Sequence, residues 1–284
     1  MKVLFCTDGS QISFNALSNF SKWVKCAEVD VIAVIDWSFL PDNVLVEADG
    51  FMVSCANIAD DILAFSKLEI EKCGLSFGES FKQCGSVVES ILEQAKNKEY
   101  DLIILGSHGK KGIQKWLGSV SREIAYGEHL STFVSKNNNK AENILFATDG
   151  SDSAKHAISR ALELFDFQGK KIYLCTVNEI PEMLFLDGKI DSNWILEIER
   201  QQDIFSQTTL NDLSKLFEDR GFYVEDAIIL TGYPSQKILD YAFNKDIDLI
   251  VSGSKNKNKM KDFLLGSVSK RILENAKCDV VIFK

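Results

Sequence analysis

Two short segments of the sequence combine glycine, hydroxyl and carboxylate groups. Thr7-Asp8-Gly9-Ser10 follows one apolar run, and Gly106-Ser107-His108-Gly109 follows another. Glycine lets backbone N–H groups approach a ligand because it has no Cβ atom. A Gly-Ser step before a helix, here Gly118-Ser119, presents unpaired N–H groups and the positive end of the helix dipole, and the serine adds a hydroxyl. With a carboxylate at the other end to accept from a ribose or an amino group, these groups suit a nucleotide.

The same groups occur a second time in the chain. Three blocks recur in one order, namely Val3–Ser10 as Ile144–Ser151, Asp101–Ser107 as Asp248–Ser254, and Leu117–Ser121 as Leu265–Ser269. Their offsets of 141, 147 and 148 residues are nearly equal, which indicates a duplicated unit. We therefore expect two domains, residues 1–136 and 141–284, joined by the polar segment Asn137–Lys140.

Strands and helices alternate in each copy. The apolar runs predict strands at 2–7, 29–35, 77–83 and 101–105, and in the second copy at 143–148, 171–177, 223–230, 248–252 and 279–283. Apolar spacing predicts helices at 13–24, 54–73 and 86–96, a further helix that starts at 119–125, and a long one at 193–219. Unbroken apolar strands are typical of parallel sheets covered on both faces, so we expect two tandem doubly wound, Rossmann-like α/β domains.

The composition excludes several classes of protein. The chain has 284 residues, a net charge of −9 and 45% hydrophobic residues, which is ordinary for a globular protein and argues against binding of nucleic acid or an anionic membrane. No apolar run is long enough to cross a bilayer. The seven cysteines include no C-x-x-C pair, and no secretory segment precedes the first strand, so we expect a reduced, cytoplasmic protein.

Each proposed site residue also has a purely structural interpretation. Asp8 and Asp149 are residue types that cap helices, and Gly118-Ser119 and Gly266-Ser267 are compatible with a turn followed by an N-cap. Both interpretations stay open on the sequence alone.

Histidines give weaker signals. His108 lies in the glycine loop and can act as acid, base or donor, but we expect a solvent-facing side chain. His129 and His156 have no partners at metal-ligand spacing, so no metal site is predicted.

With the repeats and the glycine loops in place, the chain resembles the universal stress protein family. The segment Leu4-Phe-Cys-Thr-Asp-Gly-Ser10 matches the family's first strand, and the family's nucleotide-binding members carry Gly, two residues, Gly, nine residues, Gly and Ser or Thr after the fourth strand. The resemblance covers nearly the whole chain. It implies a five-stranded parallel sheet of order 3-2-1-4-5 with helices on both faces, a cytoplasmic role in the stress response and, in a subset of members, ATP binding. It also implies pairing of the two copies within one chain as a pseudo-dimer, or a homodimer.

Both copies match the nucleotide signature with one departure each. The resemblance places Asp8 and Asp149 near adenine and ribose, and Val34 and Val177 near adenine. The phosphate-loop matches are Gly106, Gly109, Gly118 and Ser119 in the first copy and Gly253, Asn256, Gly266 and Ser267 in the second. The first copy has eight residues, not nine, between its second and third glycines, and the second copy has asparagine at its second glycine position.

Two functions follow as expectations. The first is a regulatory protein that binds ATP or a related adenine nucleotide, with Mg²⁺ as an accompanying ion, in at least one domain, and that acts on a protein partner the sequence does not identify. The alternative is a stress-linked interaction module with degenerate pockets and no nucleotide. The Walker A pattern and the residue spacings of common catalytic centres are absent from the sequence, so we expect slow ATP hydrolysis at most.

Overall fold

The computed structural model describes residues 1–36, 49–108, 117–127, 130–136, 140–179, 192–254 and 265–284. The chain divides into two compact units. The first unit comprises Met1–Asn139 with Leu164–Asp166, and the second unit comprises Lys140–Glu163 with Phe167–Lys284.

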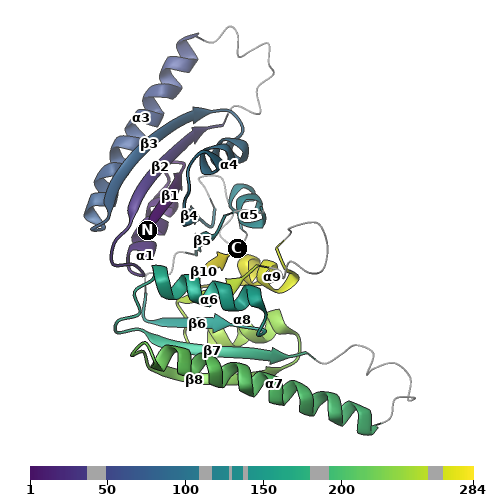
Figure 1. The fold of residues 1–284 in the computed structure, drawn as a ribbon. Coiled ribbons are helices and arrows are strands. Elements are labelled where there is room, and N and C mark those ends of the chain that lie inside the picture. The colour runs from purple at the N-terminus through teal and green to yellow at the C-terminus, as the bar shows by residue number, and fades with distance from the viewer. Residues whose placement is uncertain (37–48, 109–116, 128–129, 137–139, 180–191, 255–264) are drawn as a thin grey trace. The chain divides into compact units, whose positions relative to one another are not determined.

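The first unit alternates strands and helices (Figure 1). Its strands are β1 Lys2–Thr7, β2 Glu28–Ile35, β3 Ser76–Cys84, β4 Leu102–Gly106 and β5 Thr132–Ser135. Its helices are α1 Gln11–Ser21, α3 Asp49–Lys72, α4 Val87–Asn97 and α5 Ser119–Tyr126. The strands pair in the order β3-β2-β1-β4-β5, and every pairing is parallel.

The second unit repeats this arrangement. Its strands are β6 Asn143–Ala147, β7 Lys171–Asn178, β8 Val224–Thr231, β9 Leu249–Gly253 and β10 Asp279–Phe283. Its helices are α6 Asp152–Leu164, α7 Ser192–Glu218, α8 Pro234–Asn244 and α9 Ser267–Asn275. The parallel order β8-β7-β6-β9-β10 is again 3-2-1-4-5 in chain order, so the predicted fold and strand order are confirmed.

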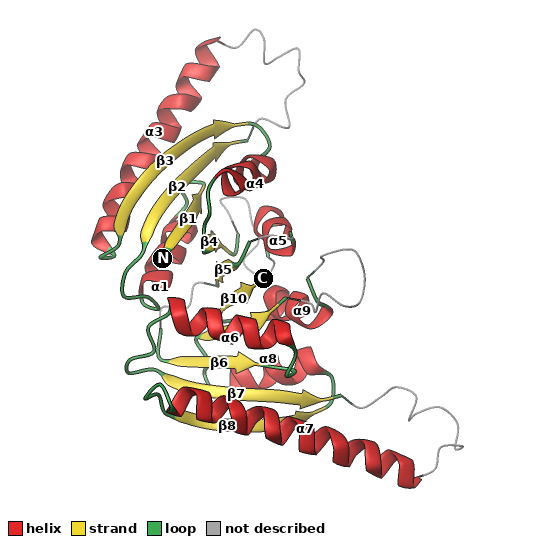
Figure 2. Ribbon diagram, viewed as in Figure 1, coloured by secondary structure: helices red, strands yellow, loops and turns green. Residues whose placement is uncertain are grey.

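Helices cover both faces of each sheet (Figure 2). In the first unit α1 and α3 pack together on one face, and α4 and α5 pack together on the other. In the second unit α6 and α7 lie on one face and α8 and α9 on the other. The central strands are consequently shielded on both sides, and Val3, Leu4 and Phe5 of β1 have no exposed area.

The predicted elements are confirmed in type and shifted at their ends. Helix α1 begins at Gln11, before the predicted start at Ser13, because the Ser10 side chain accepts a hydrogen bond from the Ser13 N–H at 3.2 Å. Strand β5 had no predicted range. In the part of the chain that is described, no helix is both long and apolar enough to cross a membrane.

Candidate functional site

In the first unit, a cavity of about 460 Å³ opens at the carboxyl ends of the strands. Its described lining residues come from β1, β2, β4, α1, α4 and α5 and from the segments that adjoin them: Cys6, Thr7, Asp8, Ser13, Ile32, Val34, Asp36, Val87, Ile91, Leu105, Gly106, His108, Gly118, Ser119, Val120 and Ser121. This is the sheet edge at which open α/β folds bind ligands. The cavity brings together five of the first copy's predicted site residues, and the sixth, Gly109, lies outside the described residues.

A tight turn positions Asp8 at this edge. Gly9 has a φ of +73°, and its N–H donates to Thr7 Oγ1 at 3.0 Å. The Ser10 N–H donates to Asp8 Oδ1 at 3.0 Å. A Cβ atom on Gly9 would lie 2.7 Å from Ile62 of α3, so both the backbone angle and the packing require glycine.

The helix caps are the serines that follow, not the aspartates. Ser10 caps α1, and in the second unit the Ala154 N–H donates to Ser151 Oγ at 3.2 Å. Asp149 Oδ1 instead accepts from the Ser151 N–H at 3.0 Å, as Asp8 does from Ser10. The interpretation of Asp8 and Asp149 as N-caps is therefore wrong, and their carboxylates line the two cavities.

Packing explains why the fourth strand of each unit ends in glycine. A Cβ atom on Gly106 would lie 3.2 Å from Ile12 of α1, and one on Gly253 would lie 2.7 Å from the Ser153 carbonyl oxygen of α6. The first turn of the covering helix therefore sits directly on this strand end. Glycine at this position is explained by the approach of two backbones and does not by itself indicate a ligand.

The start of α5 lies at the edge of the first cavity. Gly118 occupies the N-cap, where it has no side chain to satisfy the helix, and its own N–H donates to the Ser107 carbonyl at 2.7 Å. The first helical bond runs from the Arg122 N–H to the Gly118 carbonyl at 2.9 Å. Among the described residues, the N–H groups of Ser119, Val120 and Ser121 have no recorded partner. Such groups, together with the helix dipole, attract phosphate.

His108 corrects an expectation. Its side chain is 8% exposed rather than solvent-facing, and it lines the cavity. Ser107 Oγ lies 3.0 Å from His108 Nδ1. A Cβ atom on Gly118 would lie 3.3 Å from His108 Cα, so this histidine is held against the N-cap of α5.

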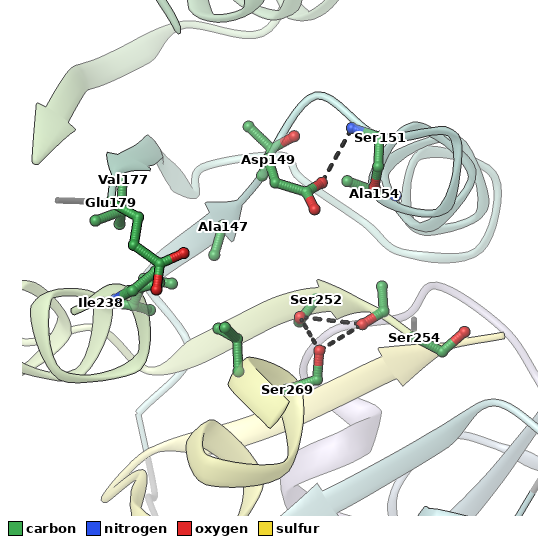
Figure 3. Close-up of a pocket in the computed structure, with 14 residues that line it drawn as sticks. Ala147, Asp149, Ser151, Ala154, Val177, Glu179, Ile238, Ser252, Ser254 and Ser269 are labelled. Atoms are coloured by element: carbon green, nitrogen blue, oxygen red, sulfur yellow. Dashed lines mark hydrogen bonds between the residues drawn. The ribbon is translucent and has the colours of Figure 1, made fainter. Parts of the chain in front are cut away.

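The equivalent cavity of the second unit is half as large, about 230 Å³. Figure 3 shows Asp149 and Glu179 beyond the ends of β6 and β7, with Ser252 and Ser269 across the pocket from them. Val177 and Gly253 also line it, as predicted. Gly266 and Ser267 occupy the N-cap and first turn of α9, but the lining side chains from α9 are Val268 and Ser269. Asn256 lies outside the described residues.

Two contacts distinguish the second cavity from the first. The Ser153 hydroxyl donates to the Ser254 carbonyl and so ties the first turn of α6 to the chain that leaves β9. Ser153 stands where the first unit has Ile12, whose side chain has no hydroxyl. At the start of α8, Pro234 lines the cavity where Val87 does in the first unit.

The charge of the described lining residues is acidic in both units. Asp8 and Asp36 line the first cavity and Asp149 and Glu179 the second, and neither described lining includes a lysine or arginine. Burial raises the pKa of the Cys6 thiol at the floor of the first cavity, so the thiol stays protonated. Within the described ranges, no group of three or more His, Cys, Asp or Glu side chains is placed to hold a metal ion.

Sequence reasoning missed the last serine of the Gly-Ser-Val-Ser block. Ser121 Oγ donates to the Gly106 carbonyl at 2.6 Å, and Ser269 Oγ donates to the Gly253 carbonyl at 2.7 Å. These bonds fix the first turn of α5 and α9 to the end of the fourth strand. The recurrence of this serine in both copies was the available signal for its role.

Comparisons with known proteins identify the family. A family model described as the universal stress protein family matches residues 81–129 and 140–284, more than half of the chain. Universal stress protein MJ0531 of Methanocaldococcus jannaschii is 33% identical over 159 residues, which are 55% of this chain and 89% of that protein. Universal stress protein MJ0577 of the same organism is 26% identical over 152 residues, which are 50% of this chain and 93% of that protein.

A solved structure shares the fold over the whole chain. A universal stress protein from Archaeoglobus fulgidus covers 100% of this chain and 98% of its own, with a TM-score of 0.71 at 20% identity. The solved neighbours also include a universal stress protein in complex with cAMP, which covers 50% of this chain and 97% of its own at 20% identity and a TM-score of 0.38. On the match to the family model, this chain belongs to the universal stress protein family.

Proposed function

We propose that this chain is a stress-response protein that binds an adenine nucleotide, ATP, as a regulatory ligand in the first unit. The observation that supports this most directly is the position of the α5 N-terminus. Ser119 and Val120 line a cavity of about 460 Å³, and among the described residues their N–H groups have no recorded partner. Small-molecule pockets typically have volumes of about 300–1,000 Å³.

The strand order supports one orientation of the nucleotide in the cavity. Asp8 and Asp36 follow β1 and β2, whereas α5 follows β4 on the other side of β1. Two carboxylates repel phosphate and accept hydrogen bonds from hydroxyl and amino groups. The ribose and base therefore fit beside Asp8 and Val34, and the phosphates fit at α5. Mg²⁺ would enter with the triphosphate, since magnesium is usually bound through phosphates.

The second unit favours the alternative function. Its cavity of about 230 Å³ lies below the usual range for a pocket that holds a small molecule, and Ser254, which lines it, is tied to α6 by the hydrogen bond from the Ser153 hydroxyl. We propose that this unit has a degenerate pocket and serves interaction with a protein partner. A cytoplasmic location is proposed with it, since Cys6, Cys26, Cys73 and Cys175 form no disulfide.

Matched substitutions at the two helix starts test the proposal. Ser119→Asp places a carboxylate in the first turn of α5, where the helix dipole tolerates it but a phosphate does not. Calorimetric titration of the full chain should give one ATP site per chain, and Ser119→Asp should weaken ATP binding by about tenfold or more, or 1.4 kcal/mol.

Ser267→Asp makes the same change in α9 and serves as the control. It should leave ATP binding unchanged. Loss of binding in Ser267→Asp alone would assign the nucleotide to the second unit. A wild-type chain that binds no ATP at millimolar concentration contradicts the proposal and favours the interaction module.

A further inference from the structure

His108 is a buried polar residue with no role in the nucleotide site proposed above. It is 92% buried, it lines the first cavity, and it packs against Gly118 at the start of α5. His108 therefore lines the same cavity as Ser119 and Val120, whose N–H groups are proposed to receive the phosphates.

Ser107 holds this imidazole from a fixed backbone. The Ser107 N–H donates to the Ser135 carbonyl of β5 at 2.9 Å, and the Ser107 carbonyl accepts from the Gly118 N–H at 2.7 Å. Its hydroxyl lies 3.0 Å from His108 Nδ1. When the hydroxyl donates to Nδ1, the ring proton of a neutral imidazole resides on Nε2, because each neutral ring has one donor and one acceptor nitrogen. A hydrogen bond at one ring nitrogen thus selects the role of the other.

We propose that Ser107 orients His108 so that its Nε2–H donates to the phosphate group seated at the N-terminus of α5. This deepens the proposed function and rests on it. His108 is then the residue by which the first unit distinguishes a phosphorylated nucleotide from its nucleoside, and Ser107 is a positioning residue. A charge-assisted hydrogen bond of this kind is about twice as strong as a neutral one.

The charges around the cavity are consistent with this assignment. Asp8 after β1 and Asp36 after β2 are the carboxylates among its described lining residues, and neither follows β4. His108 follows β4 and is therefore on the side of the cavity that can receive an anion. The second copy has lysine at the position that corresponds to His108, Lys255, so the assignment concerns the first unit only.

Titration of the full chain with ATP and with adenosine tests the proposal. His108→Ala should weaken ATP binding about tenfold or more and leave adenosine binding unchanged, because adenosine has no phosphate to receive the bond. His108→Gln should restore most of the ATP affinity, since its side-chain amide also donates. Ser107→Ala should give a smaller loss that is again confined to ATP. His156→Ala, at an exposed position on α6, is the matched control and should change neither affinity.

Two outcomes overturn the proposal while leaving nucleotide binding intact. One is that His108→Ala loses ATP and adenosine affinity equally, or loses neither, while Ser119→Asp still weakens ATP binding. The other is a ¹⁵N NMR spectrum of the ATP complex in which the His108 ring proton resides on Nδ1. Absence of ATP binding in the wild-type chain instead refutes the proposed function, and this assignment with it. If His108→Ala does not fold, the Gln and Ser107→Ala variants and the NMR spectrum still decide.

Discussion

At the scale of single residues, Gly9 and Gly150 make the turn that leaves the first strand of each unit. Their φ angles are +73° and +72°. A side chain there faces α3 in the first unit, through Ile62, and α7 in the second, through Phe205. The turn that presents the cavity aspartate is thus shaped by the long helix that covers it, and the glycine would be needed even without a ligand.

Gly9→Ala should therefore destabilise the fold through two effects. A left-handed backbone costs a non-glycine residue about 1–2 kcal/mol, and overpacking against Ile62 adds about 1 kcal/mol or more. Chemical denaturation of the full chain measures the sum.

Gly74→Ala is the control for the backbone effect alone. Gly74 has a φ of +72°, but a Cβ atom there would have nothing within 4 Å. The two variants should differ by the Ile62 contact, and the difference should vanish in an Ile62→Ala background. Equal losses in Gly9→Ala and Gly74→Ala would show that Ile62 moves aside without cost.

The sequence predicted the positions of the cavity residues better than their local roles. Asp8 and Asp149 were correctly placed at strand ends, but whether an aspartate caps a helix depends on which oxygen reaches the third N–H of that helix. In this protein the hydroxyl oxygens of Ser10 and Ser151 accept from those N–H groups, so the serines are the caps. The burial of His108 depends on the packing of Gly118 against it, which no local pattern encodes.

At the scale of elements, a buried carboxylate joins β2 to its neighbours in the first unit. The Asp30 side chain has no exposed area, and it accepts from the Glu79 N–H of β3 at 2.8 Å and from the Tyr100 hydroxyl at 2.8 Å. Lys98 Nζ lies 3.3 Å away. Burial alone would raise the pKa of Asp30, but the hydrogen bonds from Glu79, Tyr100 and Lys98 outweigh it and lower the pKa.

Asp30→Asn should make the stability of the protein less dependent on acid pH. Because the pKa in the folded state lies below the unfolded value of about 3.9, the charged cluster stabilises the fold above that pH, and this contribution is lost as pH falls through the folded-state pKa. We expect Asp30→Asn to lower the free energy of unfolding by about 1.5–3 kcal/mol near neutral pH, and by less below about pH 4. Urea unfolding between pH 7 and pH 2 measures this difference.

The control is Asp60→Asn, which removes an exposed carboxylate that Lys82 contacts at 2.8 Å. Exposed ion pairs contribute about 0–1 kcal/mol, so this variant should follow the wild-type pH curve. A constant gap between Asp30→Asn and wild type across the whole pH range would show that the loss comes from packing rather than from the charge.

Elements with strong periodicity were predictable, and short or exposed ones were not. Strand β5 is only four residues long and had no predicted range of its own, although the family resemblance and the predicted fifth strand of the second copy, at 279–283, implied one. The apolar residues of helix α7, from Trp194 to Phe217, are spaced as in a helix that packs against a sheet along one face. Its second half does so, with Phe217 fully buried, but Trp194 is 49% exposed because the first half has no sheet beneath it.

At the scale of the whole molecule, the sequence repeat accounts for the strand order and strand-end turns that the two units share. It does not account for the difference in volume between their cavities. The repeated blocks contain the strand ends, the turns at Asp8 and Asp149, and the serines Ser121 and Ser269 that bond to the end of the fourth strand. These features are alike in both units. The cavities differ twofold in volume, and their linings also differ at positions outside the blocks, such as Val87 against Pro234. Side-chain size at those positions has no periodic signal, so the sequence alone favoured neither unit strongly.

The last prediction concerns the proposed domain boundaries, residues 1–136 and 141–284. Each range contains its own five hydrogen-bonded strands and the helices on both faces, which is what a domain needs to bury a core of its own. Expressed separately, both fragments should show cooperative unfolding by circular dichroism. ATP at about 100 times its dissociation constant should stabilise the first fragment by about 2.7 kcal/mol and leave the second unaffected. If the full chain binds ATP but the folded first fragment gains no stability from it, the nucleotide site is not in the first unit. A fragment that fails to fold would instead place the boundary elsewhere.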